Sequence, residues 1–202
     1  MAEATLIPLF PDTLYMHNID VGEYDLSSIE WVKNVGNDVS VDLNILDQEQ
    51  FSKLKGTIER CLNDYFYNVL RANRQAEIYI TESWLNKTYR GGYHHQHAHT
   101  NSVFSGVLYL EYDDPEKTGK IQFLANKFDQ IDFEVYEQNV YNARGFAAVP
   151  KKGLILIFPS AVQHKVDEYK SDTPRISLSF NTFLNNVISK KRTTGLKLNK
   201  GE

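Results

Sequence analysis

Cysteine is almost absent from this chain of 202 residues, and long apolar runs are absent altogether. The single cysteine, Cys61, has no partner for an internal disulfide, so a reducing compartment fits the sequence. The longest apolar runs are too short to span a bilayer, and the N-terminus lacks the features of a signal peptide. We therefore expect a soluble protein without membrane association, located in the cytoplasm, or in the host cytoplasm if the chain is viral.

Basic residues are not in excess either, since the formal net charge is −4. This balance argues against a dedicated nucleic-acid-binding protein, which usually presents a strongly basic face. Hydrophobic residues make up 42% of the chain and aromatic residues 12%, enough to build a sizeable core and to exclude wholesale disorder. The length suits one β-rich domain, so we expect residues 1–202 to form a single domain.

One segment has helical periodicity, whereas most of the remaining chain is typical of strands. Apolar residues recur at helical spacing from Asp47 to about Asn73, which predicts a flanking helix with Asp47 as its N-cap. Between residues 76 and 186, short β-forming runs alternate with turn signals. This pattern favours a mainly β fold with a flanking helix, a jelly roll of the cupin-like type. The basic tail, residues 190–202, is expected to be frayed.

The histidines are concentrated in one short segment, since four of the six lie within residues 93–102. Alternate side chains of an extended strand point the same way. On this rule His95, His97 and His99 would share one face of a strand. His94 would lie on the opposite face. Two imidazoles at positions i and i+2 can both reach one metal ion.

A third histidine ligand would have to come from elsewhere, where only His17 and His164 remain. His164 follows the apolar run 154–158 and a turn, which is typical of a strand end that presents a side chain. The sequence therefore predicts a mononuclear metal site built from His97, His99 and His164. A solvated histidine-rich strand without a metal is the alternative.

A candidate anion-binding group follows eleven residues after His164. Arg175 and Ser177 occupy alternate positions of a predicted strand and would share a face. Arginine suits two-bond recognition of a carboxylate. A dicarboxylate could then bind the metal with one end and Arg175 with the other, with Tyr109 as a third contact. The alternative is that Arg175 is a surface charge on the wet face of its strand.

Ordered motifs along most of the chain resemble those of the iron(II)- and 2-oxoglutarate-dependent oxygenases. More narrowly, they resemble the 2-oxoglutarate oxygenases of tailed phages and marine bacteria, and the likeness reaches prolyl-hydroxylase-like enzymes. The matching pieces are Leu9-Phe10-Pro11, Ser83-Trp84-Leu85-Asn86, His97-Ala98-His99-Thr100-Asn101-Ser102 running into Ser105-Gly106-Val107-Leu108-Tyr109-Leu110, Phe158-Pro159-Ser160 with His164, and Arg175-Ile176-Ser177 through Phe180-Asn181.

The resemblance implies a double-stranded β-helix core that uses iron(II), 2-oxoglutarate and dioxygen, with ascorbate as a supporting reductant. It implies His97 as the first metal ligand and His164 as the distal one. It also implies that Arg175 binds the far carboxylate of 2-oxoglutarate, helped by Ser177 and Tyr109. The expected reaction is hydroxylation of a protein or peptide side chain, with proline as a candidate, or of a small molecule, with release of succinate and carbon dioxide. A non-catalytic, cupin-like metal-binding protein is the alternative.

One position departs from the pattern of the broad superfamily, which places a carboxylate two residues after the first histidine. His99 stands there in this chain, and the narrower family also often carries histidine at that position. Three neutral imidazoles would leave the iron one charge more positive. The second ligand is therefore left open between His99 and the alternatives His95, Asp113 and Asp167. The acidic and aromatic segment 126–144 is expected to be a substrate-side loop.

Overall fold

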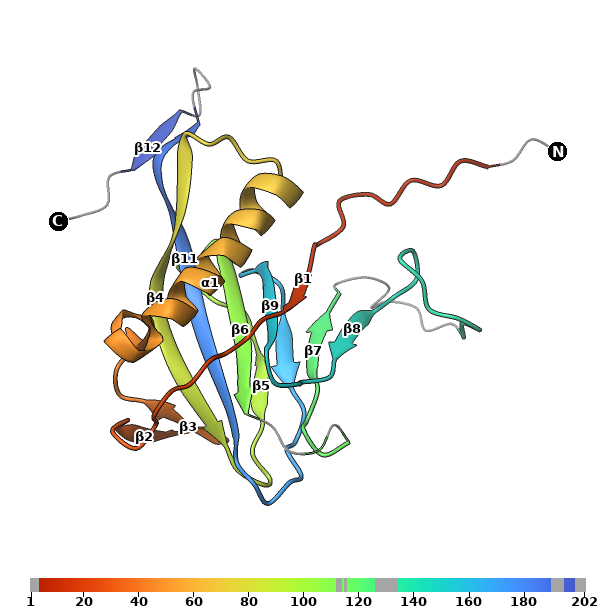
Figure 1. Ribbon diagram of the computed structural model, residues 1–202. Helices are drawn as coiled ribbons and strands as arrows, with labels where there is room; N and C mark the ends of the chain where they lie inside the picture. The colour runs from red at the N-terminus through yellow and green to blue at the C-terminus, as the bar shows by residue number, and fades with distance from the viewer. Residues whose placement is uncertain (1–3, 112–113, 115, 126–133, 190–194, 199–202) are drawn as a thin grey trace.

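The structure is a computed structural model that describes all residues except 1–3, 112–113, 115, 126–133, 190–194 and 199–202. It is mainly β, as the sequence predicts, with two antiparallel sheets and one helical layer (Figure 1). The strands are β1 (Tyr15–Asn18), β2 (Trp31–Asn34), β3 (Asn37–Ser40), β4 (Ala76–Thr88), β5 (His94–His97), β6 (Phe104–Glu111), β7 (Ile121–Leu124), β8 (Gly145–Ala148), β9 (Leu154–Pro159), β10 (His164–Val166), β11 (Arg175–Ser189) and β12 (Leu196–Leu198).

The larger sheet has the strand order β1-β9-β6-β11-β4-β3-β2, with β12 paired to the far end of β11. The smaller sheet has the order β5-β10-β7-β8. Strands that are adjacent in the larger sheet are mostly distant in the sequence. For example, β11 lies between β4 and β6. This topology places residues from the middle and the end of the chain side by side.

Alternation along β6 explains how the larger sheet builds two cores. Leu108 and Leu110 are buried in a cluster shared with the helix, whereas Val107 and Tyr109 are buried in a second cluster on the opposite face. Phe123 of the smaller sheet belongs to that second cluster. At β6 the larger sheet therefore buries apolar side chains on both faces, one packed against the helix and the other toward the smaller sheet.

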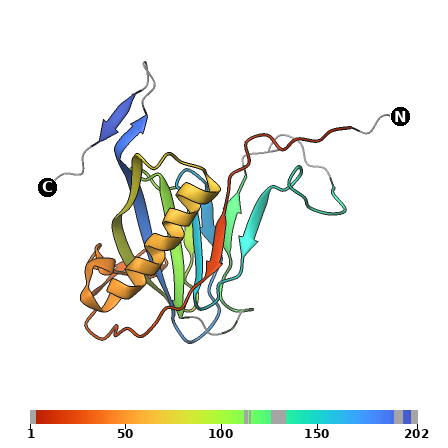
Figure 2. The same ribbon diagram turned by 45° about the horizontal axis from the view of Figure 1, so that its top comes forward.

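The helical layer crosses the outer face of the larger sheet (Figure 2). It contains two 3₁₀ turns (Ile45–Asp47 and Glu49–Phe51), α1 (Ser52–Asn63) and a π-helical segment, Asp64–Val69. Four side chains of α1 are buried against the sheet, namely Leu54, Ile58, Cys61 and Leu62. In the part of the chain that the structure describes, no helix is long and apolar enough to cross a membrane.

The predicted bounds of this helix, 47 to 73, are wrong at both ends. The α-helix proper begins at residue 52, and Asp47 does not cap it; its carboxylate instead pairs with Lys55 Nζ at 2.7 Å. At the other end, Arg71 has a φ of +57°, a left-handed conformation that a continuous helix excludes. Apolar periodicity marks the buried face of such a segment but does not resolve 3₁₀, α and π turns from one another.

The predicted frayed tail is wrong over Leu196–Leu198, which form β12. Residues 186–189 of β11 extend beyond its pairing with β6 and leave an edge that β12 covers. The rest of the expected tail, apart from residue 195, lies outside the described residues. Closer to the N-terminus, β2 and β3 pair as a hairpin.

Candidate metal centre

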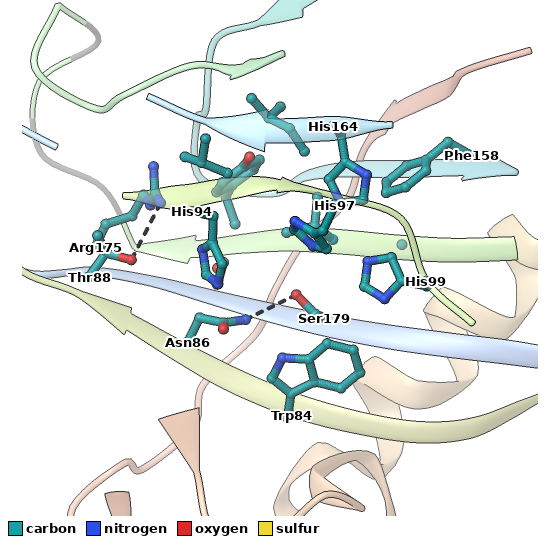
Figure 3. Close-up of a pocket in the computed structure, with 16 residues that line it drawn as sticks. Trp84, Asn86, Thr88, His94, His97, His99, Phe158, His164, Arg175 and Ser179 are labelled. Carbon is teal, nitrogen blue, oxygen red and sulfur yellow. Dashed lines mark hydrogen bonds between the residues drawn. The ribbon is translucent and has the colours of Figure 1, made fainter. Parts of the chain in front are cut away.

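The two predicted histidine segments meet at the edge of the smaller sheet. His97 of β5 and His164 of β10 are direct partners in the antiparallel pairing, and their ring centroids are 4.3 Å apart. His99 lies just beyond β5, with its ring centroid 5.2 Å from each of the other two. The potential ligand atoms of the three side chains all lie within 4.8 Å of one another. The structure thus brings together the three residues that the sequence predicts as metal ligands (Figure 3).

The tautomers of two of these rings follow from their hydrogen bonds. His97 Nδ1 lies 2.8 Å from the carbonyl oxygen of His95, and His164 Nδ1 lies 3.0 Å from that of Val162. A carbonyl oxygen only accepts, so each Nδ1 carries a proton and donates it. Each Nε2 then keeps its lone pair, and this tautomer is the form that binds a metal.

Burial keeps two imidazoles of this cluster, those of His99 and His164, neutral. It lowers the pKa of both His99 and His164 to about 4, and the neighbouring imidazole of His97 lowers each pKa further. The hydrogen bond that His164 Nδ1 donates to the Val162 carbonyl oxygen raises the pKa of His164 but does not offset burial. At neutral pH these side chains are therefore unprotonated at one nitrogen, as metal binding requires.

The expectation that His94 lies on the opposite face from His97 is wrong. His164 pairs with His97 and Val166 pairs with His94, so three steps along β5 match two steps along β10. This bulge turns His94 onto the same face as His97, and both line one pocket. A bulge is not visible in residue alternation, which is why sequence reasoning missed this side chain.

Arg175 lies at the other end of the same pocket from the histidines (Figure 3). Its side chain is 2% exposed, and burial lowers its pKa. Its Nη1 donates to the carbonyl oxygens of Thr118 and Gly119, at 2.5 and 3.1 Å, while its Nε has no partner among the described residues. No carboxylate in the described part of the chain pairs with it. A buried cation in this state is costly, and a bound carboxylate would stabilise it.

Ser177 and Tyr109, the other two predicted contacts, are buried partners on β11 and β6 and line the same pocket. The Arg175 guanidinium lies 5.7 Å from the ring centroid of Tyr109. Burial raises the pKa of Tyr109 to about 12, although Arg175 acts in the opposite direction. The phenol therefore stays protonated at neutral pH and can donate a hydrogen bond.

Alternation along β4 supplies lining residues that the sequence analysis did not assign to the site. Trp84, Asn86 and Thr88 all point into the pocket, as Ser179 of β11 does. Asn86 Nδ2 donates to Ser179 Oγ at 3.0 Å, and Asn86 Oδ1 accepts from Asn37 Nδ2 at 3.0 Å. Period-two spacing could have grouped the three β4 residues, but only the tertiary structure shows which face of β4 the pocket uses.

The alternative ligands do not join the cluster. His95 is exposed, and Asp167 accepts from Gln122 Nε2 at 2.7 and 2.6 Å without lining the pocket. Asp113 lies outside the described residues. Of the predicted substrate-side loop, residues 126–133 also lie outside them, and residues 134–144 do not line the pocket.

Comparison with solved structures shows the same fold in several oxygenases. A prolyl-4-hydroxylase from Pseudomonas putida is 15% identical, with a TM-score of 0.50, over 76% of this chain and 77% of that one. HygX from Streptomyces hygroscopicus, with nickel, 2-oxoglutarate and hygromycin B bound, is 11% identical, with a TM-score of 0.51, over 78% and 74%. A Trichoplax adhaerens prolyl hydroxylase, in complex with a hypoxia inducible factor peptide, is 12% identical, with a TM-score of 0.51, over 73% and 63%. No curated protein sequence matches the chain significantly.

Residues 82–181 match the model of the family described as "Putative 2OG-Fe(II) oxygenase". This range contains every residue that lines the pocket, from Trp84 to Ser179. The fold is the double-stranded β-helix of 2-oxoglutarate oxygenases, as the family resemblance implies. The chain therefore belongs to the 2OG-Fe(II) oxygenase family, an oxidoreductase family that uses iron(II) and 2-oxoglutarate.

Proposed function

We propose that this oxygenase hydroxylates a side chain of a protein or peptide, with proline as the first candidate. In this proposal His97, His99 and His164 hold the iron(II). The observation that carries the assignment is the convergence of three imidazoles at one end of a pocket whose other end holds a buried guanidinium. That guanidinium has no carboxylate partner among the described residues, and its Nε has no hydrogen-bond partner there. That arrangement suits one metal ion and one dicarboxylate.

The donor atoms of the pocket fit both groups. Imidazole nitrogens are suitable ligands for iron, and the Nε2 atoms of His97 and His164 are free for that purpose. Arg175 offers an Nε without a described partner, and it would bind the far carboxylate of 2-oxoglutarate. Ser177 and Tyr109 lie beside it with hydroxyl groups that can donate to the same carboxylate.

The protein's own contribution is positioning and exclusion of water. When bound, iron and 2-oxoglutarate supply the oxidative decarboxylation that is coupled to hydroxylation. Arg175 would fix the orientation of the dicarboxylate, because strands β4 and β6 pair with β11 on either side of it. The hydrogen bonds from His97 Nδ1 and His164 Nδ1 fix the orientation of both rings. Apolar lining residues such as Val107 and Phe158 keep the pocket dry.

The substrate class is supported by structures that share the fold. The Trichoplax adhaerens prolyl hydroxylase holds a peptide, which favours a peptidyl substrate. A small-molecule substrate is the second candidate, because HygX of the same fold holds hygromycin B. Incubation with a peptide library under turnover conditions, followed by mass spectrometry, tests the first candidate. A mass gain of one oxygen on a peptide supports it. A gain found only in a metabolite mixture supports the second.

The coupled reaction itself can be tested without knowing the substrate. The protein, supplied with iron(II), ascorbate and 2-oxoglutarate in air, should form succinate slowly. Under anaerobic conditions the same mixture should show a metal-to-ligand charge-transfer band. A non-catalytic metal-binding protein would form no succinate and show no such band.

Arg175→Ala separates cosubstrate binding from metal binding. We expect the 2-oxoglutarate affinity to fall at least about 30-fold, because a charge-assisted hydrogen bond contributes roughly 2 kcal/mol, with metal affinity unchanged. Isothermal titration of the metal-loaded protein with 2-oxoglutarate measures the effect. Arg90→Ala is the matched control, because Arg90 is exposed and pairs with Asp172 at 2.8 Å. An equal loss of metal and 2-oxoglutarate affinity would contradict the assignment.

A further inference from the structure

The three histidines of the candidate metal centre are not held in the same way. His97 and His164 lie in paired strands, and the ring of each donates to a backbone carbonyl. His99 lies two residues past the end of β5, before Asn101, which has a left-handed φ of +54°. Strand pairing therefore does not fix its position, and its ring has no hydrogen bond within the described part of the chain. Its backbone N–H donates to the carbonyl oxygen of Ser160 at 2.9 Å.

Ser160 binds the segment that carries His99 at several points. Besides accepting from His99, it donates its own N–H to the carbonyl oxygen of Val103 at 3.1 Å. Its hydroxyl lies 2.8 Å from the hydroxyls of both Ser102 and Ser105. The side chain is 1% exposed. One buried serine thus holds both ends of residues 99–105, through its backbone and its side chain.

The Ser160 hydroxyl is part of a hydrogen-bonded chain that reaches into the larger sheet. Ser105 Oγ donates to Asn181 Oδ1 at 2.7 Å, and Asn181 Nδ2 donates to Glu82 Oε1 at 2.7 Å. Ser102 Oγ donates to the carbonyl oxygen of Phe104 at 2.9 Å. These groups keep partners of their own if the Ser160 hydroxyl is removed. The hydroxyl is therefore not needed to satisfy them, and its contribution is to the position of residue 160.

The same turn also carries another ligand of the proposed set. Ser160 lies four residues before His164, and the carbonyl oxygen of Val162 between them accepts from the His164 ring. The carbonyl oxygen of Ser160 therefore accepts from the His99 N–H, and the carbonyl oxygen of Val162 accepts from the His164 ring. The pairing of β10 with β5 and β7 holds His164 in place, so a shift of residue 160 would move His99 relative to His164.

We propose that Ser160 is a positioning residue that sets how His99 reaches the metal centre. The proposal rests on the assignment of His99 as a metal ligand. The hydroxyl holds the backbone of residue 160 in place. The carbonyl oxygen of that residue accepts the hydrogen bond from the His99 N–H and so positions His99. Ser160 does not itself touch the metal or the cosubstrate in this proposal.

Cobalt(II) binding to Ser160→Ala tests the inference, with a competing chelator to measure affinity and the visible spectrum to report on the ligands. We expect affinity to fall about tenfold, as is typical when a group that orients a metal ligand is lost. The spectrum should shift toward that of His99→Ala. The double variant should bind cobalt(II) no more weakly than His99→Ala alone, because Ser160 acts only through His99.

Ser40→Ala is the matched control for the loss of a buried hydroxyl. Ser40 is also 1% exposed and forms two hydrogen bonds, to the carbonyl oxygen of Asp42 and from the N–H of Leu85. We expect it to leave cobalt(II) affinity and spectrum unchanged. If Ser160→Ala behaves like this control while His99→Ala weakens binding, or if the two losses add in the double variant, the inference is wrong. If His99→Ala leaves binding unchanged, the proposed ligand set is wrong instead.

Discussion

The charge of the proposed ligand set is the property that most distinguishes this site at the scale of single residues. In the usual arrangement of these oxygenases, two histidines and one carboxylate bind the iron. Here His99 stands where the carboxylate is expected, and no Asp or Glu lines the pocket in the part of the chain that the structure describes. With iron(II) bound by three neutral imidazoles and Arg175 at the far end, the pocket would carry a larger positive charge than a pocket in which one ligand is a carboxylate.

His99→Asp should therefore weaken the binding of the 2-oxoglutarate dianion. An added carboxylate near the metal repels it, and at an effective dielectric of about 20 such a repulsion amounts to a few kcal/mol at most. We expect roughly a tenfold loss of 2-oxoglutarate affinity, with divalent metal affinity equal or higher. Titration of the manganese-loaded protein measures both.

His99→Asn is the control for this change, because asparagine matches aspartate in size and carries no charge. It should retain more of the 2-oxoglutarate affinity than His99→Asp. Equal 2-oxoglutarate affinities in the two variants would show that charge at this position does not govern cosubstrate binding.

At the scale of single elements, strand β6 connects the helical core to the pocket. Gly106 and Phe180 are partners in the pairing of β6 with β11, and the Phe180 ring packs over Gly106. A Cβ at position 106 would overlap this ring, which is itself fully buried. Glycine at this position lets the aromatic ring fill the core on the helix side while the backbone lines the pocket on the other.

Gly106→Ala should destabilise the fold by roughly 1–3 kcal/mol, the usual cost of overpacking a core. Urea unfolding followed by circular dichroism measures the change in free energy of unfolding. Gly22→Ala is a comparison at a glycine whose added Cβ would meet no atom within 4 Å, although its φ of +66° makes alanine strained there. If Gly106→Ala unfolds at the wild-type urea concentration, the Phe180 ring does not pack tightly against position 106.

At the scale of the whole molecule, the two sheets enclose histidines that burial holds neutral. Burial lowers the pKa of His94, His99 and His164 to about 4 each, below the unfolded value of 6.5. Between those pH values the unfolded chain binds more protons than the folded one. Stability then falls as the pH is lowered through this window.

The metal-free protein should accordingly lose stability when the pH is lowered from 7 to 4.5. Urea unfolding at a series of pH values measures the loss. His99→Gln should flatten the dependence, because it removes one of the groups that must be protonated on unfolding. His17→Gln is the control, since His17 is exposed on β1 away from the pocket. A pH dependence that His99→Gln leaves unchanged would contradict this explanation.

The sequence by itself determined the residue types of the site and the class of the fold. Residue spacing predicts the β-rich pattern and singles out His97, His99, His164 and Arg175 as site residues. The family resemblance then implies roles for His97, His164 and Arg175. Local periodicity carries this information because alternation depends only on neighbours in the chain.

Only the tertiary structure decided which of these side chains meet. The bulge in β5 brings His94 into the pocket, the pairing of β4 with β11 adds Trp84 and Asn86, and Ser160 contacts His99 across 61 positions of the sequence. The helix bounds also depended on packing rather than on periodicity. Contacts of this kind arise from pairing between distant segments, and local spacing does not encode the register of that pairing.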